Sequence, residues 1–228
     1  MKRITIFSIA TIYMLTEMTN LRAQEDYRFE IGGGIGMTGY LGDANTSSLL
    51  NHPSWDTEVL FRYLINPRWN LKTNFFVGAL SGDTSNMLNV LPAGKTYKFS
   101  TIFYEISELA EFNFFNYGIG ETYRQLKRFT PYIAAGAGIT LWRVAGDGGA
   151  AFCLPLGIGL RFKPSERINL GLEFLIKKTF TDRLDGKDLD DPMRIKSSFM
   201  KNTDWYSTLT FTLSYEFSKR CATCNYKD

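Results

Sequence analysis

The sequence predicts an all-β fold, an eight-stranded antiparallel up-and-down β-barrel that spans a membrane. Three observations predict it: an N-terminal segment typical of a cleavable signal peptide, eight runs in which apolar and polar residues alternate, and connections that tend to alternate between long and short. Aromatic residues make up 15% of the 228 residues, a composition that suits strands. The mean hydropathy of −0.15 fits a transmembrane barrel, because the lumen-facing half of each strand is polar.

We expect residues 1–23 to be a signal peptide and residues 24–218 to be the barrel. Lys2 and Arg3 precede the uncharged stretch Ile4–Leu15, which is shorter than the roughly 20 residues of a spanning helix. The signal peptide holds three of the 26 Lys and Arg and one of the 23 Asp and Glu, which leaves 23 and 22. The resulting net charge of +1 gives no argument for nucleic-acid binding.

The strands are predicted from alternation with a period of two. The clearest run is 206–217, where one face is apolar or aromatic and the other carries hydroxyl and carboxylate groups. It is longer than the usual strand of about 5 to 6 residues and covers the roughly 9 to 11 residues that cross a bilayer. The same pattern recurs, in chain order, in the runs 28–37, 58–65, 68–77, 152–162 and 168–177.

Two further strands are less regular. In residues 99–115, Glu108 falls on the apolar face of Ile102 and Ile106, which suggests a bulge or a position at the membrane edge. Residues 129–142 carry Ala and Gly on both faces, so their orientation is open.

The polar faces of the strands predict a lumen lined by charges of both signs. An eight-stranded barrel is too narrow for an open channel, so these side chains should form a polar core in which the charges are satisfied. The predicted lumen residues are Glu30, Glu58, Arg62, Lys72, Glu105, Glu111, Arg161, Glu173 and Lys177. Aromatic residues at strand ends are expected in girdles at the membrane interfaces: Trp55, Trp69, Tyr132, Trp142, Trp205, Tyr215 and Phe217.

The connections supply an independent argument. Asn66-Pro67-Arg68 and residues 163–166 are predicted tight turns. The longer connections are 43–53, 82–97, 144–150 and 182–203. This pattern is typical of outer-membrane barrels such as those of OmpA or OmpX size, where short turns are periplasmic, and an even strand count puts both termini in the periplasm. A soluble barrel would instead need its aromatic faces inside.

One connection departs from this pattern. Residues 116–128 should form a periplasmic turn, yet the segment is long and charged. Its cationic residues, which we expect to contact a partner, are Arg124, Lys127 and Arg128.

Few residues suggest chemistry. His52 and Ser54 could pair a base with a nucleophile, but no strand geometry aligns them and no orienting acid is evident. The five aspartates in residues 182–191 match no EF-hand spacing, and we interpret the segment as a solvated external loop. We therefore predict no catalytic, metal or cofactor residue and no enzymatic activity.

The three cysteines fall in two regions. Cys153 is predicted in mid-strand, facing the lumen. Cys221 and Cys224 form a CxxC in residues 219–228, a tail expected in the oxidising periplasm. A local disulfide and a thiol available for an intermolecular bridge are both open. Because a tail beyond the last strand has no role in closing the barrel, we expect it to contact a partner, with Tyr226 included.

Six segments resemble the PorG family, the small outer-membrane barrel subunits of the type 9 secretion system in Bacteroidetes. They are Tyr40-Leu41-Gly42-Asp43, INPRWNLKTN at 65–74, YEISELAEFNFF at 104–115, RFTPYIAAGAG at 128–138, PLGIGLRF at 155–162 and INLGLEFLIKKTFTDRLDG at 168–186. INPRW followed much later by KTFTD is the most specific pair. The resemblance spans most of the mature chain, and the tail CATCNYKD is outside it.

The resemblance implies a non-enzymatic role without cofactors. Such subunits help tie a periplasmic PorK/PorN ring to the outer membrane and are needed to secrete substrates with C-terminal sorting domains. Two other functions stay open: adhesion or defence through the external loops, above all residues 182–203, and lipid modification through His52 and Ser54.

Overall fold

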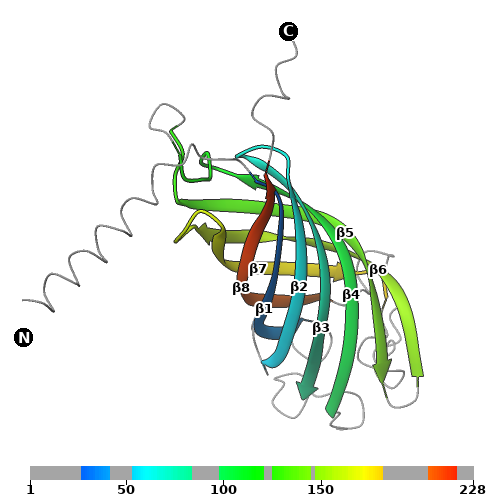
Figure 1. The fold of residues 1–228 in the computed structure, drawn as a ribbon. Coiled ribbons are helices and arrows are strands. Elements are labelled where there is room, and N and C mark those ends of the chain that lie inside the picture. Colours follow the sequence, from blue (N-terminus) through cyan, green and yellow to red (C-terminus); the bar gives the residue numbers. More distant parts are fainter. Residues whose placement is uncertain are drawn as a thin grey trace, which may run out of the picture.

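The computed structural model describes residues 27–41, 53–83, 98–120, 125–144, 147–181 and 205–219. In this part of the chain eight antiparallel strands form one closed barrel in sequence order (Figure 1). The strands are β1 (Tyr27–Leu41), β2 (Ser54–Leu64), β3 (Trp69–Asp83), β4 (Lys98–Asn113), β5 (Phe129–Val144), β6 (Asp147–Phe162), β7 (Ile168–Thr179) and β8 (Trp205–Lys219). The predicted fold class is therefore confirmed.

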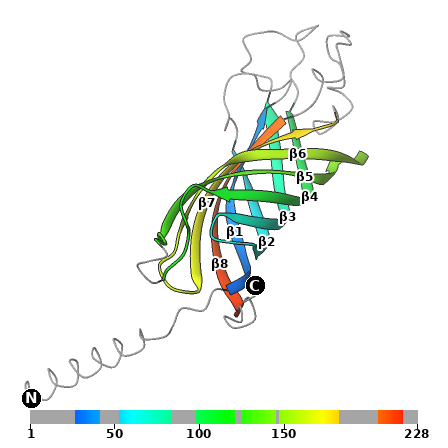
Figure 2. The ribbon, with the colours of Figure 1, turned by 90° about the horizontal axis from the view of Figure 1, so that it is seen from above.

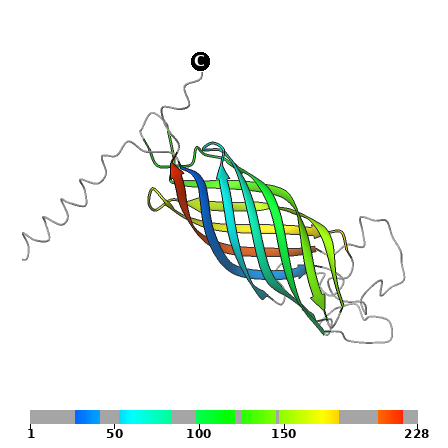
Figure 3. The same ribbon diagram turned by 45° about the vertical axis from the view of Figure 1, so that its right-hand side comes forward.

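The seam between β1 and β8 closes the barrel without a change of register. Pairing begins at Tyr27, opposite Lys219, and continues without a shift to Leu41. The two backbones lie so close that a Cβ at Gly36 would be 2.2 Å from the carbonyl oxygen of Leu209, which explains a glycine there. The strands run obliquely around the barrel (Figure 3), and closure leaves no sheet edge exposed in this part of the chain.

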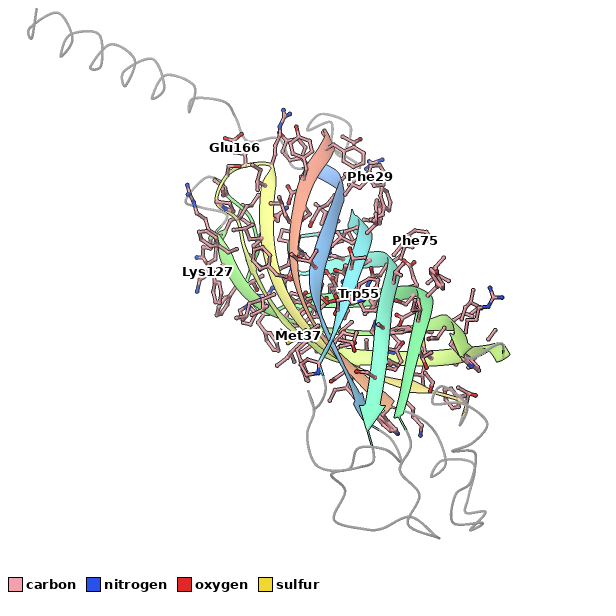
Figure 4. All side chains as sticks on the ribbon, turned by 90° about the horizontal axis from the view of Figure 1, so that it is seen from below. Phe29, Met37, Trp55, Phe75, Lys127 and Glu166 are labelled. Carbon is pink, nitrogen blue, oxygen red and sulfur yellow. The ribbon has the colours of Figure 1, made fainter. Side chains whose placement is uncertain are left out.

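The outer face is mostly apolar and the interior holds the buried charges together with some apolar residues such as Leu60 and Phe103, whereas a soluble barrel has an apolar interior. The outward Ile35 and Leu156 are 71% and 64% exposed, whereas the inward Glu30 is fully buried. Figure 4 shows side chains such as Phe29 and Phe75 on the outside. This arrangement suits a lipid environment, as in outer-membrane barrels. Within the described residues, no helix has the length and hydropathy to cross a bilayer.

The two ends of the barrel differ. At one end, Tyr27 begins β1 beside Lys219 of β8, and residues 65–68, 114–128 and 163–167 connect neighbouring strands. We call this the termini end, and both predicted tight turns lie there. The opposite end, the loop end, carries the connections from β1 to β2, β3 to β4, β5 to β6 and β7 to β8.

The expectation of a loop at 144–150 is wrong, because this segment is strand except for two residues outside the described part. Val144 of β5 pairs with Asp147 of β6. Glycine and alanine hide the alternation in the sequence, and the structure shows why they are small: a Cβ at Gly149 would lie 2.6 Å from the ring of Trp142. Figure 2 shows the β5–β6 pair reaching beyond the neighbouring strands.

Two aromatic residues expected in the girdles face the interior instead. Tyr132 is 2% exposed because its hydroxyl is bonded inside the barrel, and Trp142 is 9% exposed because it packs over Gly149. The even-numbered residues of β5 therefore point inward, which gives the orientation that the sequence left open. The other expected girdle residues lie on the outer surface: Trp55, Trp69, Trp205, Tyr215 and Phe217.

Glu108 does not mark a bulge, one of the two alternatives that the sequence left open. It lies opposite Thr73 of β3 and Ala137 of β5, and both pairings continue in constant register on either side. The alternation is unbroken, so the Glu108 side chain lies on the outer face, well inside β4.

Candidate functional site

The interior nearest the termini end holds a cluster in which cations are shared between carboxylates. Arg161 Nη2 donates to Glu30 Oε2 at 2.5 Å, and Arg62 also donates to Glu30. Arg62 Nη2 donates to Glu111 Oε1 at 3.0 Å, and Arg161 Nη1 lies 3.9 Å from Glu111 Oε2. Ser214 Oγ donates to Glu30 Oε1 at 2.5 Å. The cluster thus joins β1, β2, β4, β6 and β8.

A second cluster lies around Lys72. Lys72 Nζ donates to Glu173 Oε1 at 2.6 Å and lies 3.7 Å from Glu58 Oε1. Tyr132 Oη donates to Glu173 Oε2 at 2.7 Å. Asn74 Nδ2 donates to Glu58 Oε2 at 2.6 Å. Each carboxylate therefore has one charged and one neutral partner.

The third cluster lies toward the loop end. Lys177 Nζ donates to both carboxylate oxygens of Glu105 at 3.0 Å, and Tyr206 donates to the same carboxylate. Lys177 Nζ also lies 4.0 Å from the centroid of the Phe76 ring. The ring shields this ion pair on one side, which strengthens it relative to an exposed pair.

The structure buries all nine predicted lumen residues in these three clusters. Three further charges, Asp56, Lys163 and Glu216, are buried but were not named as lumen residues. Glu216 lies on the predicted polar face of 206–217, and Asp56 and Lys163 each continue the alternation of a predicted strand by one step. Charges that bind one another form a structural core rather than a reactive site. Within the described residues, no group of three or more His, Cys, Asp or Glu side chains is placed to hold a metal ion.

The connection from β4 to β5 folds against the termini end. We call its described residues, 114–120 and 125–128, the cap. Tyr117 inserts its side chain into the barrel, where it is 8% exposed and its hydroxyl donates to Asn169 Oδ1 at 2.7 Å. The Arg161 guanidinium lies 4.6 Å from the centroid of the Tyr117 ring. Burial raises the pKa of the Tyr117 phenol well above its ordinary value, so this group stays neutral.

The turn between β2 and β3 holds the cap in place. Tyr117 N donates to Pro67 O at 3.2 Å, and Arg68 Nε donates to Asn116 Oδ1 at 2.8 Å. The cap is also closed on itself, since Lys127 N donates to Asn116 O at 2.7 Å. The cap is therefore fixed to the termini end, although its sequence carries no periodic signal.

Lys163 lies beneath the cap, just after β6. Its ammonium is paired with Glu216, whose Oε1 also accepts a hydrogen bond from Asn169 Nδ2 at 2.9 Å. Burial lowers the pKa of Lys163, and the pairing with Glu216 opposes this shift.

The cap presents two of the predicted partner-binding residues to solvent. Lys127 and Arg128 are both exposed, and Lys127 Nζ lies 4.1 Å from the centroid of the Phe115 ring. Figure 4 shows Lys127 and Glu166 at the same end of the barrel. Arg167 is also exposed there, and its hydrogen bonds to the hydroxyls of Tyr215 and Tyr27 raise the pKa of its guanidinium.

Several predicted residues lie outside the described part of the chain: residues 1–23, His52, Arg124, the loop 182–203, Cys221, Cys224 and Tyr226. Ser54 is described, and its hydroxyl lies 2.9 Å from that of Ser81. Cys153 is a buried free thiol on the inner face of β6.

Solved structures with this architecture include several bacterial surface barrels. Neisserial surface protein A matches with a TM-score of 0.52 and 10% identity, over 83% of this chain and 97% of that one. Ail, the attachment invasion locus protein of Yersinia pestis, matches with a TM-score of 0.46 and 14% identity, over 83% and 99%. OprG from Pseudomonas aeruginosa matches with a TM-score of 0.46 and 12% identity, over 86% and 98%.

The closed barrel, its apolar exterior and its charged interior define an eight-stranded β-barrel of the outer-membrane type. Over residues 6–226 the chain matches the family described as Domain of unknown function (DUF6089), and it belongs to this family. No curated protein matches the sequence. The fold alone does not decide the function, because one barrel architecture serves many roles.

Proposed function

We propose that this chain is a non-enzymatic outer-membrane component of a type 9 protein secretion system, similar to PorG. In this role it anchors a periplasmic ring of the PorK/PorN kind to the outer membrane. The observation that carries the proposal is the ordered cationic cap at the termini end, from which the cysteine-bearing tail also leaves after Lys219. In the proposed orientation this end, with both termini, faces the periplasm.

One segment of the most specific pair in the PorG resemblance also supports this proposal. INPRW at 65–69 forms the turn that accepts the cap, through the carbonyl of Pro67 and the side chain of Arg68. Short turns are typical of the periplasmic end of such barrels, as in the four residues 65–68 between β2 and β3. A similarly short turn would be enough to join β4 to β5. The extra ordered structure is expected where a partner has to be held in a fixed orientation.

The charge of the termini end predicts the charge of the partner surface that would face it. Among the described residues there, one carboxylate is exposed, Glu166. The exposed cations are Arg28, Arg68, Lys127, Arg128 and Arg167. Complementary charge steers association and fixes orientation, so the facing surface of the ring should be acidic.

The test is a non-reducing affinity purification of the tagged full-length protein from membranes, comparing wild type with Cys221→Ser/Cys224→Ser. Co-purification of a periplasmic ring lipoprotein, with a high-mass band that the double variant loses, supports an anchor tethered by a disulfide. Unchanged co-purification in the variant supports an anchor without a covalent tether. A barrel that purifies without a partner overturns the proposal.

A charge-reversal pair tests the cap itself. Lys127→Glu/Arg128→Glu should weaken ring association and flatten its loss with salt, because fewer attractive rim charges remain for salt to screen. The control is Arg143→Glu, an exposed arginine at the loop end of β5, the strand that follows the cap. Equal effects of both variants would show that the cap is not the contact surface.

The two other functions depend on residues 182–203 and on His52, which lie outside the described part. Deleting residues 182–203 should abolish an adhesion or defence phenotype if the external loops act. A His52→Ala variant should lose a lipid-modifying activity if His52 is the base.

A further inference from the structure

One charged side chain lies on the outer wall far from both ends of the barrel. Among the outward or exposed strand residues that the structure describes, the other charged residues are the second or second-to-last residues of their strands: Arg28, Arg143 and Lys178. Glu108 has four residues of β4 between it and Asn113, the end of that strand. Its wall neighbours Leu71, Phe75 and Ile106 are exposed apolar residues.

The position of Glu108 along β4 places it inside the apolar band. Outward apolar residues flank it on both sides, with Phe112 four residues away toward the termini end and Ile102 six residues away toward the loop end. A strand tilted by about 40° advances roughly 2.5 Å per residue along the membrane normal. Glu108 is then about 10 Å from one limit and about 15 Å from the other, within an apolar band about 25 Å tall.

The barrel supplies only part of the hydrogen bonds that the Glu108 carboxyl group can form. Thr73 Oγ1 donates to Glu108 Oε2 at 2.7 Å. On the other side, the residue directly opposite is Ala137, whose methyl group neither covers the carboxyl group nor bonds to it. A carboxyl group in either protonation state has more hydrogen-bonding capacity than one hydroxyl supplies. Ionisable residues within a membrane are costly unless a partner is present, and they mark functional positions.

Small side chains surround the carboxyl group on the β5 side. Ala110 follows two residues along β4, and Ala135 and Ala137 are exposed on β5, whereas the nearby outward residues Leu71, Phe75, Tyr104 and Ile106 are larger. We call Thr73, Glu108, Ala110, Ala135 and Ala137 the Glu108 patch. Small residues let two membrane proteins approach closely, which a long donor side chain from a neighbour would require to reach Glu108.

We propose that the Glu108 patch docks a second integral outer-membrane protein, one that places a Lys or Arg side chain within its own membrane-spanning wall. Lipid tails supply no donor, and at this depth headgroups are about 10 Å away. A second copy of this chain would bring another glutamate against Glu108, which like-charge contact disfavours. The inference is independent of the ring-anchoring role, because that role uses the termini end.

The first test separates docking from a structural role. The purified full-length protein, refolded alone in phospholipid vesicles, should have the same or a higher urea midpoint in Glu108→Leu than in wild type, since lipid prefers leucine. Thr57→Val is the control, because Thr57 is an outward hydroxyl that donates to Gly34 O of its own barrel at 3.0 Å. A lower midpoint in Glu108→Leu would mean that Glu108 only holds β4 to β3, and the proposal would fail.

The second test identifies the neighbour in native membranes. A photo-crosslinking residue at Ala137 should give an adduct with another outer-membrane protein, and Glu108→Leu should reduce its yield by about tenfold or more. The same probe at Leu172, an outward residue of β7, is the positional control. Support requires that the crosslinked peptide be a membrane-spanning segment with a Lys or Arg. Adducts with lipid alone, with a second copy, or with equal yield in Glu108→Leu would overturn the proposal.

Discussion

A glutamate side chain has different surroundings in the interior of this barrel and on its outer wall. Inside, eleven of the twelve buried charges in the described chain belong to ion pairs, and the twelfth, Asp56, accepts a hydrogen bond from Thr210. On the wall, Glu108 accepts a hydrogen bond from Thr73 within the apolar band. The cost of a glutamate in a membrane protein thus depends on what surrounds the carboxyl group, and not on membrane depth alone.

The largest expected effect is on the unfolding free energy when a glutamate of the interior is replaced by leucine, and the same substitution on the outer wall is its comparison. Glu30→Leu removes the main acceptor of Arg161 and one of the two carboxylates that pair with Arg62, and an uncompensated buried charge costs about 3–5 kcal/mol of unfolding free energy. Glu108→Leu should leave the unfolding free energy unchanged or higher. Urea unfolding in vesicles measures both. If the two variants lose similar stability, the contrast between interior and wall is wrong.

Removing the cap's buried side chain should have the next largest effect. Tyr117→Ala loses the packing against Arg161 and the hydrogen bond to Asn169, worth about 2–4 kcal/mol together. Tyr117→Phe keeps the ring and should cost about 1 kcal/mol. Limited proteolysis should cut the cap faster in Tyr117→Ala than in wild type. An unchanged cleavage rate would show that Tyr117 does not hold the cap.

The sequence could predict those features that depend on the alternation of apolar and polar residues along a strand. That covers the strand count, the inward faces and all nine lumen residues that were named, because alternation records which side each residue faces. The predictions of an outward Trp142 and of a loop at 144–150 were wrong, because glycine carries no side-chain signal. The bulge expected at Glu108 is absent, because alternation says nothing about register. The cap could not be predicted, as Tyr117 enters the barrel from a segment without periodicity.

A smaller effect is expected at the turn beneath the cap. Asn66 Oδ1 accepts hydrogen bonds from the backbone N–H groups of Arg68 and Trp69 at 2.9 and 2.8 Å. Asn66→Ala should lower the unfolding free energy by about 1 kcal/mol, because solvent compensates part of the loss at an exposed turn. Asn66→Asp retains an acceptor oxygen and serves as the matched control. A loss as large as that of Glu30→Leu would contradict the view that buried charges dominate stability.

The smallest effect concerns Lys163, the buried cation whose pKa burial lowers. Because the pKa of Lys163 is lower in the folded state, the folded protein binds fewer protons at this site than the unfolded chain does. Its contribution to stability is therefore present above the unfolded-state pKa of 10.5 and is lost as the pH falls through the folded-state pKa. The wild-type unfolding free energy should therefore gain a component that rises toward pH 10.5, and Lys163→Met should remove it. Lys127→Met, at an exposed position, is the control and should keep the rise. Urea unfolding at a series of pH values up to 10.5 measures the slopes, and identical slopes in wild type and Lys163→Met would show that Glu216 holds Lys163 charged as firmly as the paired cations deeper in the barrel.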